Sequence, residues 1–272
     1  MRRGGRLSLL LIAALLLTGC DSIASGALTA IYSDDERFLL SDGRLRTASE
    51  APTVDAETLA RNYLRVAFQQ EAGGGQRARA VRLLRWEGAV SYRVEGGGAD
   101  PATRRAIDAY LARLAALSGL EIFDVGARRR PAALRILIID EAERQALRDR
   151  LAERGDMETL DLLSVSPLDT PCYLEFFADA RGVITRGRVI IRAEATGLLR
   201  QACIEEELAQ TLGLLNDDPT VYPSIFNDDQ EFATLTRHDE DLIRIHYDPR
   251  LRPGMTAADA RPVVARIVQD LF

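Results

Sequence analysis

The polar run between positions 205 and 217 holds the side chains whose types and spacing can do chemistry. Glu206 and Gln210 are four residues apart, so they share one face of a helix, and Glu207 stands beside them. A carboxylate can act as a general base, and carboxylate and amide oxygens together are ligands for hard cations such as calcium. The same pattern also occurs on many solvated helices, so spacing alone assigns no role to these side chains or to Asn216 further along.

Zinc chemistry has little support in the composition. The chain has two histidines and three cysteines, whereas zinc prefers imidazole and thiolate, and a catalytic zinc usually keeps three strong protein ligands. Without a metal ion, water keeps a pKa of about 16 rather than about 7, which leaves Glu207 no activated nucleophile to deprotonate. We therefore expect no zinc cofactor, with calcium or another hard cation as the alternative.

The same run resembles the zinc motif of the metzincin peptidases, His-Glu-x-x-His-x-x-Gly-x-x-His. Overlaying the two puts Glu206, Gln210 and Asn216 at the three metal-ligand positions, where all three residues differ from the motif. Glu207 and Gly213 match the general-base glutamate and the turn glycine. The resemblance implies a zincin fold with an altered metal site.

Flanking segments extend this resemblance over residues 86–250. Residues 218–226 are similar to the matrixin loop that leads to the Met-turn, with Phe226 at the methionine position. Residues 235–247 are similar to the matrixin C-terminal helix, with Leu235, Asp239, Ile243 and Tyr247 in register. The upstream elements follow the order of a zincin N-terminal subdomain.

The chain also resembles an uncharacterised family of bacterial lipoproteins, grouped with zincin-like peptidases, that carries a domain of unknown function. The family signature, Cys-x-x-Glu-Glu-x-x-Gln-x-Leu-Gly-Leu-x-Asn-Asp, matches from Cys203 to Asp217. No activity is established for that family. The resemblance implies a pseudoenzyme more than an active enzyme.

The first residues predict export and lipid anchoring. Arg2, Arg3 and Arg6 precede an apolar stretch, residues 7–17, that is too short to span a bilayer. Residues 17–20, Leu-Thr-Gly-Cys, resemble the bacterial lipobox, in which the cysteine is lipidated and becomes the new N-terminus. We expect Cys20 to be that site and the domain to face the periplasm from a membrane of the cell envelope. The alternatives are an ordinary signal peptide and an uncleaved anchor.

The net charge restricts the expected binding partners, and the two remaining cysteines indicate how they pair. The formal charge is −6, and a nucleic-acid binder needs a cationic surface, so we expect no nucleic-acid partner. The expected partners are the membrane, through the lipid, and a peptide or envelope protein. In an oxidising compartment Cys172 and Cys203 predict a disulfide, with two free thiols as the alternative. Closing that loop would stabilise the fold by roughly 3 kcal/mol.

Hydrophobic periodicity predicts an α+β fold, a mixed sheet with covering helices. The resemblance implies that this fold is zincin-like, with an active-site-type helix at 202–214 and a C-terminal helical subdomain. Strands are expected at 89–94, 133–139, 172–177 and 186–192, and helices at 56–71, 101–117 and 140–155. The expected organisation is a signal peptide (1–19), a tether (20–56), a helical preface (57–85), a degenerate metzincin-like domain (86–255) and a C-terminal helix (256–272).

The remaining polar groups have simpler interpretations. His238 is expected to cap a helix or lie at the surface, and His246 to be partly buried, neither of them a metal ligand. Ser224 has no evident triad partners. Residues 128–130 read as a solvated arginine loop, and the acidic pairs 217–218 and 228–229 as an acidic rim or, alternatively, a calcium site.

Three functions remain open. The first is an envelope-anchored pseudopeptidase that binds a peptide, a protein or a wall fragment beside Glu206, Glu207 and Gln210. The second is a hydrolase that uses Glu207 as base with a non-standard metal site. The third is a structural envelope component with an inert cleft.

Overall fold

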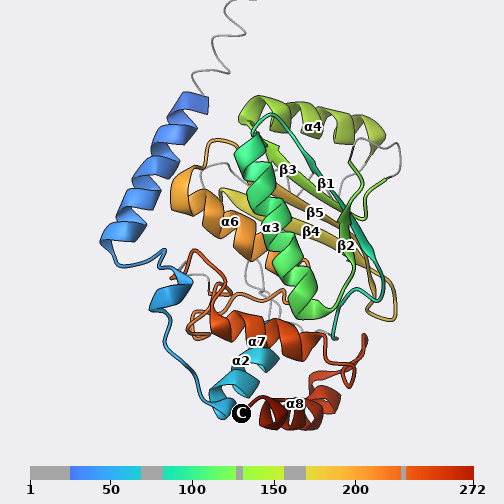
Figure 1. Ribbon diagram of the computed structural model, residues 1–272. Coiled ribbons are helices and arrows are strands. Elements are labelled where there is room, and N and C mark those ends of the chain that lie inside the picture. The colour runs from blue at the N-terminus through green and yellow to red at the C-terminus, as the bar shows by residue number, and fades with distance from the viewer. Residues whose placement is uncertain (1–24, 69–81, 127–130, 156–169, 228–230) are drawn as a thin grey trace, which may run out of the picture.

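The computed structural model describes residues 25–68, 82–126, 131–155, 170–227 and 231–272. The expected signal peptide and Cys20 lie outside these ranges, as do the arginines at 128–130 and the acidic pair at 228–229. Within the described residues the fold is mixed α/β, a sheet with helices packed around it (Figure 1). The expected fold class is confirmed at this level.

Five strands form the sheet in the part of the chain that the structure describes, in the order β2-β1-β3-β5-β4. Neighbouring strands pair in parallel except β4, which runs antiparallel to β5 at the edge. The bounds are β1 Val90–Glu95, β2 Ile122–Asp124, β3 Leu134–Ile139, β4 Cys172–Ala178 and β5 Ile184–Arg192. Four of these strands were predicted; β2 has three residues, too few to show alternation.

Helices provide the crossovers that parallel strands require. α3 (Pro101–Ser118) joins β1 to β2 and begins at Asp100, whose side chain accepts hydrogen bonds from the backbone N–H groups of Ala102 and Thr103. α4 (Glu141–Arg154) follows β3 and begins with a capping box between Asp140 and Glu143. α6 (Gly197–Gln210) follows β5.

At the central strand β3 both faces of the sheet are buried, as is usual for parallel strands. On β3, Ile136 and Ile138 join the main core, whereas Leu137 and Ile139 pack with Leu147 of α4. α3 and α6 lie over one face (Figure 1). The sheet therefore holds α6 against its main core.

A second group of helices closes the molecule beyond the end of α6 (Figure 1). α2 (Ala56–Phe68) packs against both α7 (Arg237–His246) and α8 (Ala257–Leu271). The expected C-terminal helical layer is thus present. It includes the helix that the sequence suggested as a separate preface.

The segment expected to be a tether contains an ordered helix over residues 25–41, which we call the N-terminal helix. Its buried side chains, Leu28, Tyr32 and Leu39, pack against α6 at Leu199 and Ala202. The sequence of this segment shows no sustained apolar periodicity, because Phe38 and Leu40 are exposed while Leu28, Tyr32 and Leu39 are buried. Tertiary packing supplies the stability that its own sequence lacks.

The N-terminal helix also sets where α6 begins. Thr196, at the N-cap of α6, makes no side-chain capping bond, and Glu36 Oε1 instead accepts a hydrogen bond from the Leu198 N–H at 2.8 Å. A carboxylate at this position complements the positive end of the helix dipole. α6 therefore starts at Gly197 rather than at 202, and it ends at Gln210, before a turn.

Candidate functional site

The predicted disulfide is confirmed and ties α6 to the edge of the sheet. Cys172, the first residue of β4, is bonded to Cys203, with Cα atoms 5.7 Å apart. Cys203 lies one helical turn before Glu206 and Glu207. The bond therefore fixes the start of the edge strand next to the motif helix.

The Gln210 side chain forms hydrogen bonds through its amide nitrogen. Its buried side-chain Nε2 donates hydrogen bonds to both carboxylate oxygens of Asp217, at 2.7 and 2.9 Å. An amide nitrogen has no free lone pair to offer a cation, so this arrangement opposes ligation by Gln210 at that point. The amide pairs with the carboxylate instead.

Glu207 is a buried carboxyl group, 7% exposed. Its Oε2 has no hydrogen-bond partner among the described residues. Burial, and then the nearby charge of Asp217, raise the pKa of Glu207 well above its usual value. The shift disfavours the ionised form that a general base needs.

The other motif positions do not complete a zinc centre. Glu206 is half-buried on α6, and Asn216 is buried, with its backbone N–H donating to Val66 O on α2 at 3.2 Å. Throughout the described ranges, no group of three or more His, Cys, Asp or Glu side chains is placed to hold a metal ion. The donor set of carboxylates and amides does not fit the zinc that the metzincin motif implies.

Gly213 makes the turn that follows α6. Its φ is +109°, and a Cβ at this position would lie 1.8 Å from Leu84 O and 2.8 Å from His246 Nε2. Only glycine tolerates both the conformation and the approach. The turn predicted from the motif is therefore required by packing.

His246 belongs to this packing. It is fully buried, its Nε2 lies 2.8 Å from Leu84 O, and its Nδ1 lies 3.2 Å from the Tyr63 hydroxyl. Burial lowers the pKa of His246 to about 4, so the ring is neutral at physiological pH. It is more deeply buried than the sequence indicated, and both nitrogens have protein partners.

Two aromatic residues hold the end of α6. Trp86 Nε1 donates to Thr211 O at 2.8 Å, and the Tyr247 hydroxyl donates to Leu212 O at 2.9 Å. Both carbonyls belong to the turn that follows Gln210, so the two aromatic residues fix that turn. The sequence placed Tyr247 in register with the matrixin helix but did not reveal this contact.

Asp239 joins the loop at 223–226 to the start of α7. The fully buried carboxylate accepts hydrogen bonds from Ser224 Oγ at 2.5 Å, the Ile225 N–H at 3.2 Å and the Thr236 N–H at 2.8 Å. Ser224 is thus engaged in a structural bond, and Phe226 is fully buried.

His238 differs from its expected place. It is buried, 3% exposed, with Nε2 lying 3.2 Å from Asn62 Nδ2 of α2, so it is neither a cap nor a surface residue. The capping role falls to Thr236, whose side chain accepts from the Asp239 N–H. The amphipathic pattern of α7 alone could not show that α2 covers this position.

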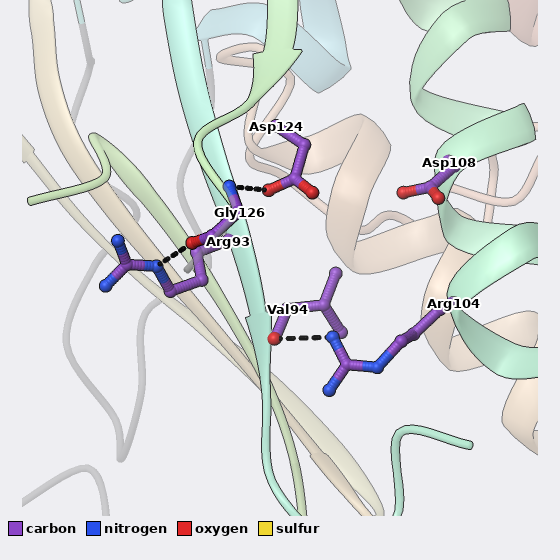
Figure 2. A pocket seen from close by; sticks show the side chains of 6 residues that line it. All are labelled: Arg93, Val94, Arg104, Asp108, Asp124 and Gly126. Atoms are coloured by element: carbon purple, nitrogen blue, oxygen red, sulfur yellow. Dashed lines mark hydrogen bonds between the residues drawn. The ribbon is translucent and has the colours of Figure 1, made fainter. Parts of the chain in front are cut away.

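A cavity of about 350 Å³ lies beside α3 at the carboxyl ends of β1 and β2 (Figure 2). Figure 2 shows the Asp108 and Asp124 carboxylates on one side of it, and Arg104 donating to Val94 O, at 2.8 Å. Arg93 Nε donates to Gly126 O at 3.1 Å. Both arginines thus donate to main-chain carbonyls.

A second cavity, of about 530 Å³, lies between parts of α3 and α6 and is lined by Tyr110, Arg113, Ile204 and Glu205 among others. Glu205 also fastens α6, because its Oε2 accepts the Leu235 N–H at 2.7 Å. Neither cavity is lined by Glu206 or Glu207. The sequence signalled neither, since each is formed by segments distant along the chain.

Among the residues the structure describes, none forms a helix long and apolar enough to cross a membrane. No curated protein matches the chain. Residues 56–266, well over half of the chain, match the family described as Protein of unknown function (DUF2927), and the chain therefore belongs to that family.

Proposed function

We propose that this protein is a lipid-anchored protein of the bacterial envelope whose zincin-like domain binds an extended peptide or protein segment without hydrolysing it. The mixed five-stranded sheet with helices packed around it is compatible with the proposed domain type. The DUF2927 assignment leaves the activity open, so the argument rests on the site.

The disulfide between Cys172 and Cys203 carries the proposal. It places the start of an antiparallel edge strand beside the helix face that bears Glu206. An edge strand recognises an extended peptide through main-chain hydrogen bonds, for which no metal is needed. A covalent bond keeps this strand and the motif helix in fixed positions relative to each other.

The chemistry of the motif supports binding over hydrolysis. Glu207 is buried with a raised pKa, and Gln210 pairs with Asp217. A hydrolase of zincin type needs an ionised base and a cation that activates water. The groups at these positions are instead a buried carboxyl group whose pKa is raised and an amide turned toward a carboxylate.

The test measures binding and turnover on the same chains. Fluorescein-labelled tryptic fragments of casein report binding by anisotropy, and quenched fluorescent casein reports hydrolysis. We expect binding without turnover, at least a tenfold loss of affinity in Glu206→Arg, and no loss in Glu153→Arg, which makes the same change at an exposed position on α4.

Two results would overturn the proposal. Casein hydrolysis that disappears in Glu207→Gln would make the protein a hydrolase. Absence of both binding and turnover, in wild type and in the Leu45→Glu chain introduced below, would leave a structural envelope component.

Anchoring has its own test. Cells that express the full chain are grown with radiolabelled palmitate, and the protein is followed in membrane fractions. We expect label and membrane association in wild type and neither in Cys20→Ser. Label retained in Cys20→Ser would overturn the anchoring.

A further inference from the structure

Residues 44–48, which we call the strap, lie on the domain like an added strand. The Arg46 N–H donates to Glu231 O at 2.9 Å, and the Ala233 N–H donates to Arg46 O at 2.8 Å, as a parallel bridge. The Ala48 N–H donates to Thr234 Oγ1 at 2.7 Å. Main-chain bonding of this kind is how sheet edges recognise extended peptides.

Leu45 provides the apolar anchor of the strap. It is 1% exposed and shares a hydrophobic cluster with Ala195, Leu199, Ala202 and Ala233. Its φ is +53°, the left-handed region that branched side chains avoid. A leucine held in this conformation indicates that the apolar pocket fixes it.

Arg46 occupies a second, cationic subsite. Its guanidinium carbon lies 4.6 Å from the centroid of the Phe232 ring and 5.6 Å from that of Tyr222. Its Nη2 also lies 3.3 Å from Glu231 Oε2. Two aromatic rings and a carboxylate form a site suited to a guanidinium or an ammonium group.

The groove under the strap leads toward the motif. Leu199 and Ala202 line it, and Glu206 follows Ala202 by four residues, on the same face of α6. The groove residues of α6 and of the 231–234 segment lie within 56–266, the range that matches the family, whereas the strap and the cluster members Leu28, Tyr32 and Leu39 lie before it. One side of the groove is thus part of the family domain, and the strap and the N-terminal helix are additions to it.

We propose that this groove is a peptide-binding site, that the strap fills it in cis, and that its external ligand is an extended segment with an aliphatic residue followed directly by a basic one. The inference rests on the proposed binding function and names the kind of partner. The partner segment displaces the strap and remakes its hydrogen bonds to residues 231–234.

The experiment uses the full chain and a fluorescein-labelled nonapeptide with the sequence of residues 42–50. Leu45→Glu releases the strap, because it puts a charge in the apolar pocket. Leu40→Glu is the matched control, since Leu40 is 45% exposed on the N-terminal helix. Hydrogen exchange reports whether residues 44–48 open while β5 and α6 stay protected.

Ala48→Pro is a second, milder variant. It removes the N–H that donates a hydrogen bond to Thr234 Oγ1. Proline fits at this position because Ala48 is the first residue of the short helix η1 (Ala48–Glu50). Thr47 already has the extended conformation that precedes proline, with φ −91° and ψ 160°.

We expect the nonapeptide to bind the Leu45→Glu chain at least tenfold more tightly than wild type or Leu40→Glu, with Ala48→Pro in between. Replacing the leucine of the peptide by serine, or the arginine after it by glutamate, abolishes binding. Equal affinity for wild type and both strap variants would overturn occupancy in cis. A strap that opens in either variant without peptide binding would overturn the groove as a peptide site.

Failure of the groove proposal can be distinguished from failure of the proposed function. Casein fragments that bind wild type and Leu45→Glu equally would place peptide binding elsewhere on the domain, which retains the function and rejects the groove. Fragments that bind no chain reject both.

Discussion

Gln210 and Asp217 form a two-bond pair, with the amide nitrogen 2.7 and 2.9 Å from the two carboxylate oxygens. The pair closes the turn after α6 back onto the helix. Gln210 stands at a metal-ligand position of the metzincin motif, and its side chain makes two half-buried hydrogen bonds there.

Gln210→Glu should therefore destabilise the fold. The change removes the donor and sets a second carboxylate against Asp217, which we expect to cost about 1–3 kcal/mol in urea unfolding at pH 7.5. Gln145→Glu is the control, because Gln145 also donates to an aspartate, Asp149, but on the exposed surface of α4. A loss in Gln145→Glu equal to that in Gln210→Glu would contradict the buried pairing.

Glu207→Gln should become more stable than wild type as pH rises. The pKa of Glu207 is raised on folding, so the folded state holds its proton above pH 4.5, and the stability from this group falls with rising pH. The neutral amide removes that loss. We expect the variant to gain relative to wild type by up to about 1.4 kcal/mol per pH unit above pH 4.5. Urea unfolding at pH 4, 6 and 8 measures it; a pH-independent difference would refute the raised pKa.

The lowered pKa of His246 predicts that stability changes with pH in the opposite direction. Its pKa is lowered from 6.5 to about 4 by burial, so the unfolded chain binds a proton that the folded state refuses. Stability present above pH 6.5 is lost as pH falls toward 4, by up to about 3 kcal/mol. Histidine NMR should show one ring titrating near pH 4. A His246 ring that titrates near 6.5 in the folded protein would exclude this contribution.

Gly213→Ala should be among the most damaging small changes in the chain. The new Cβ would meet Leu84 O at 1.8 Å, and we expect a loss of about 3 kcal/mol or more, or failure to fold. Gly119→Ala isolates the backbone effect, because Gly119 has φ +73° and nothing lies within 4 Å of its added Cβ. It should cost about 1 kcal/mol. Thermal melting that shows equal losses would argue against the close approach.

Local patterns explain which elements could be predicted. β3 is aliphatic except for Arg135, β5 contains the aliphatic run 189–191, and Asp100 with Pro101 is a strong helix start, so these elements follow from sequence alone. The first turn of α6 could not be predicted from sequence, because the side chain that caps it belongs to Glu36, more than 150 residues away in the chain. The N-terminal helix was missed because its apolar stripe has meaning only once α6 lies beneath it.

The candidate site divides in the same way. Spacing located Glu206, Glu207, Gln210 and Gly213 on or just after one helix, and cysteine usage located the disulfide. The burial of Glu207, the partner of His238 on α2 and the groove under Leu45 depend on contacts between distant segments. No local pattern records such contacts.

The order of strands across the sheet has a consequence for how the chain assembles. β4 and β5 are the one pair of described strands that are consecutive along the chain and hydrogen-bonded to each other in antiparallel fashion. Each parallel pair must first close a longer loop, which costs entropy before any contact repays it. Folding should therefore start from the β4–β5 hairpin, with α6 following directly in sequence, and the sheet should grow outward through β3 and β1. The short β2 strand, paired through three residues, is the natural last addition.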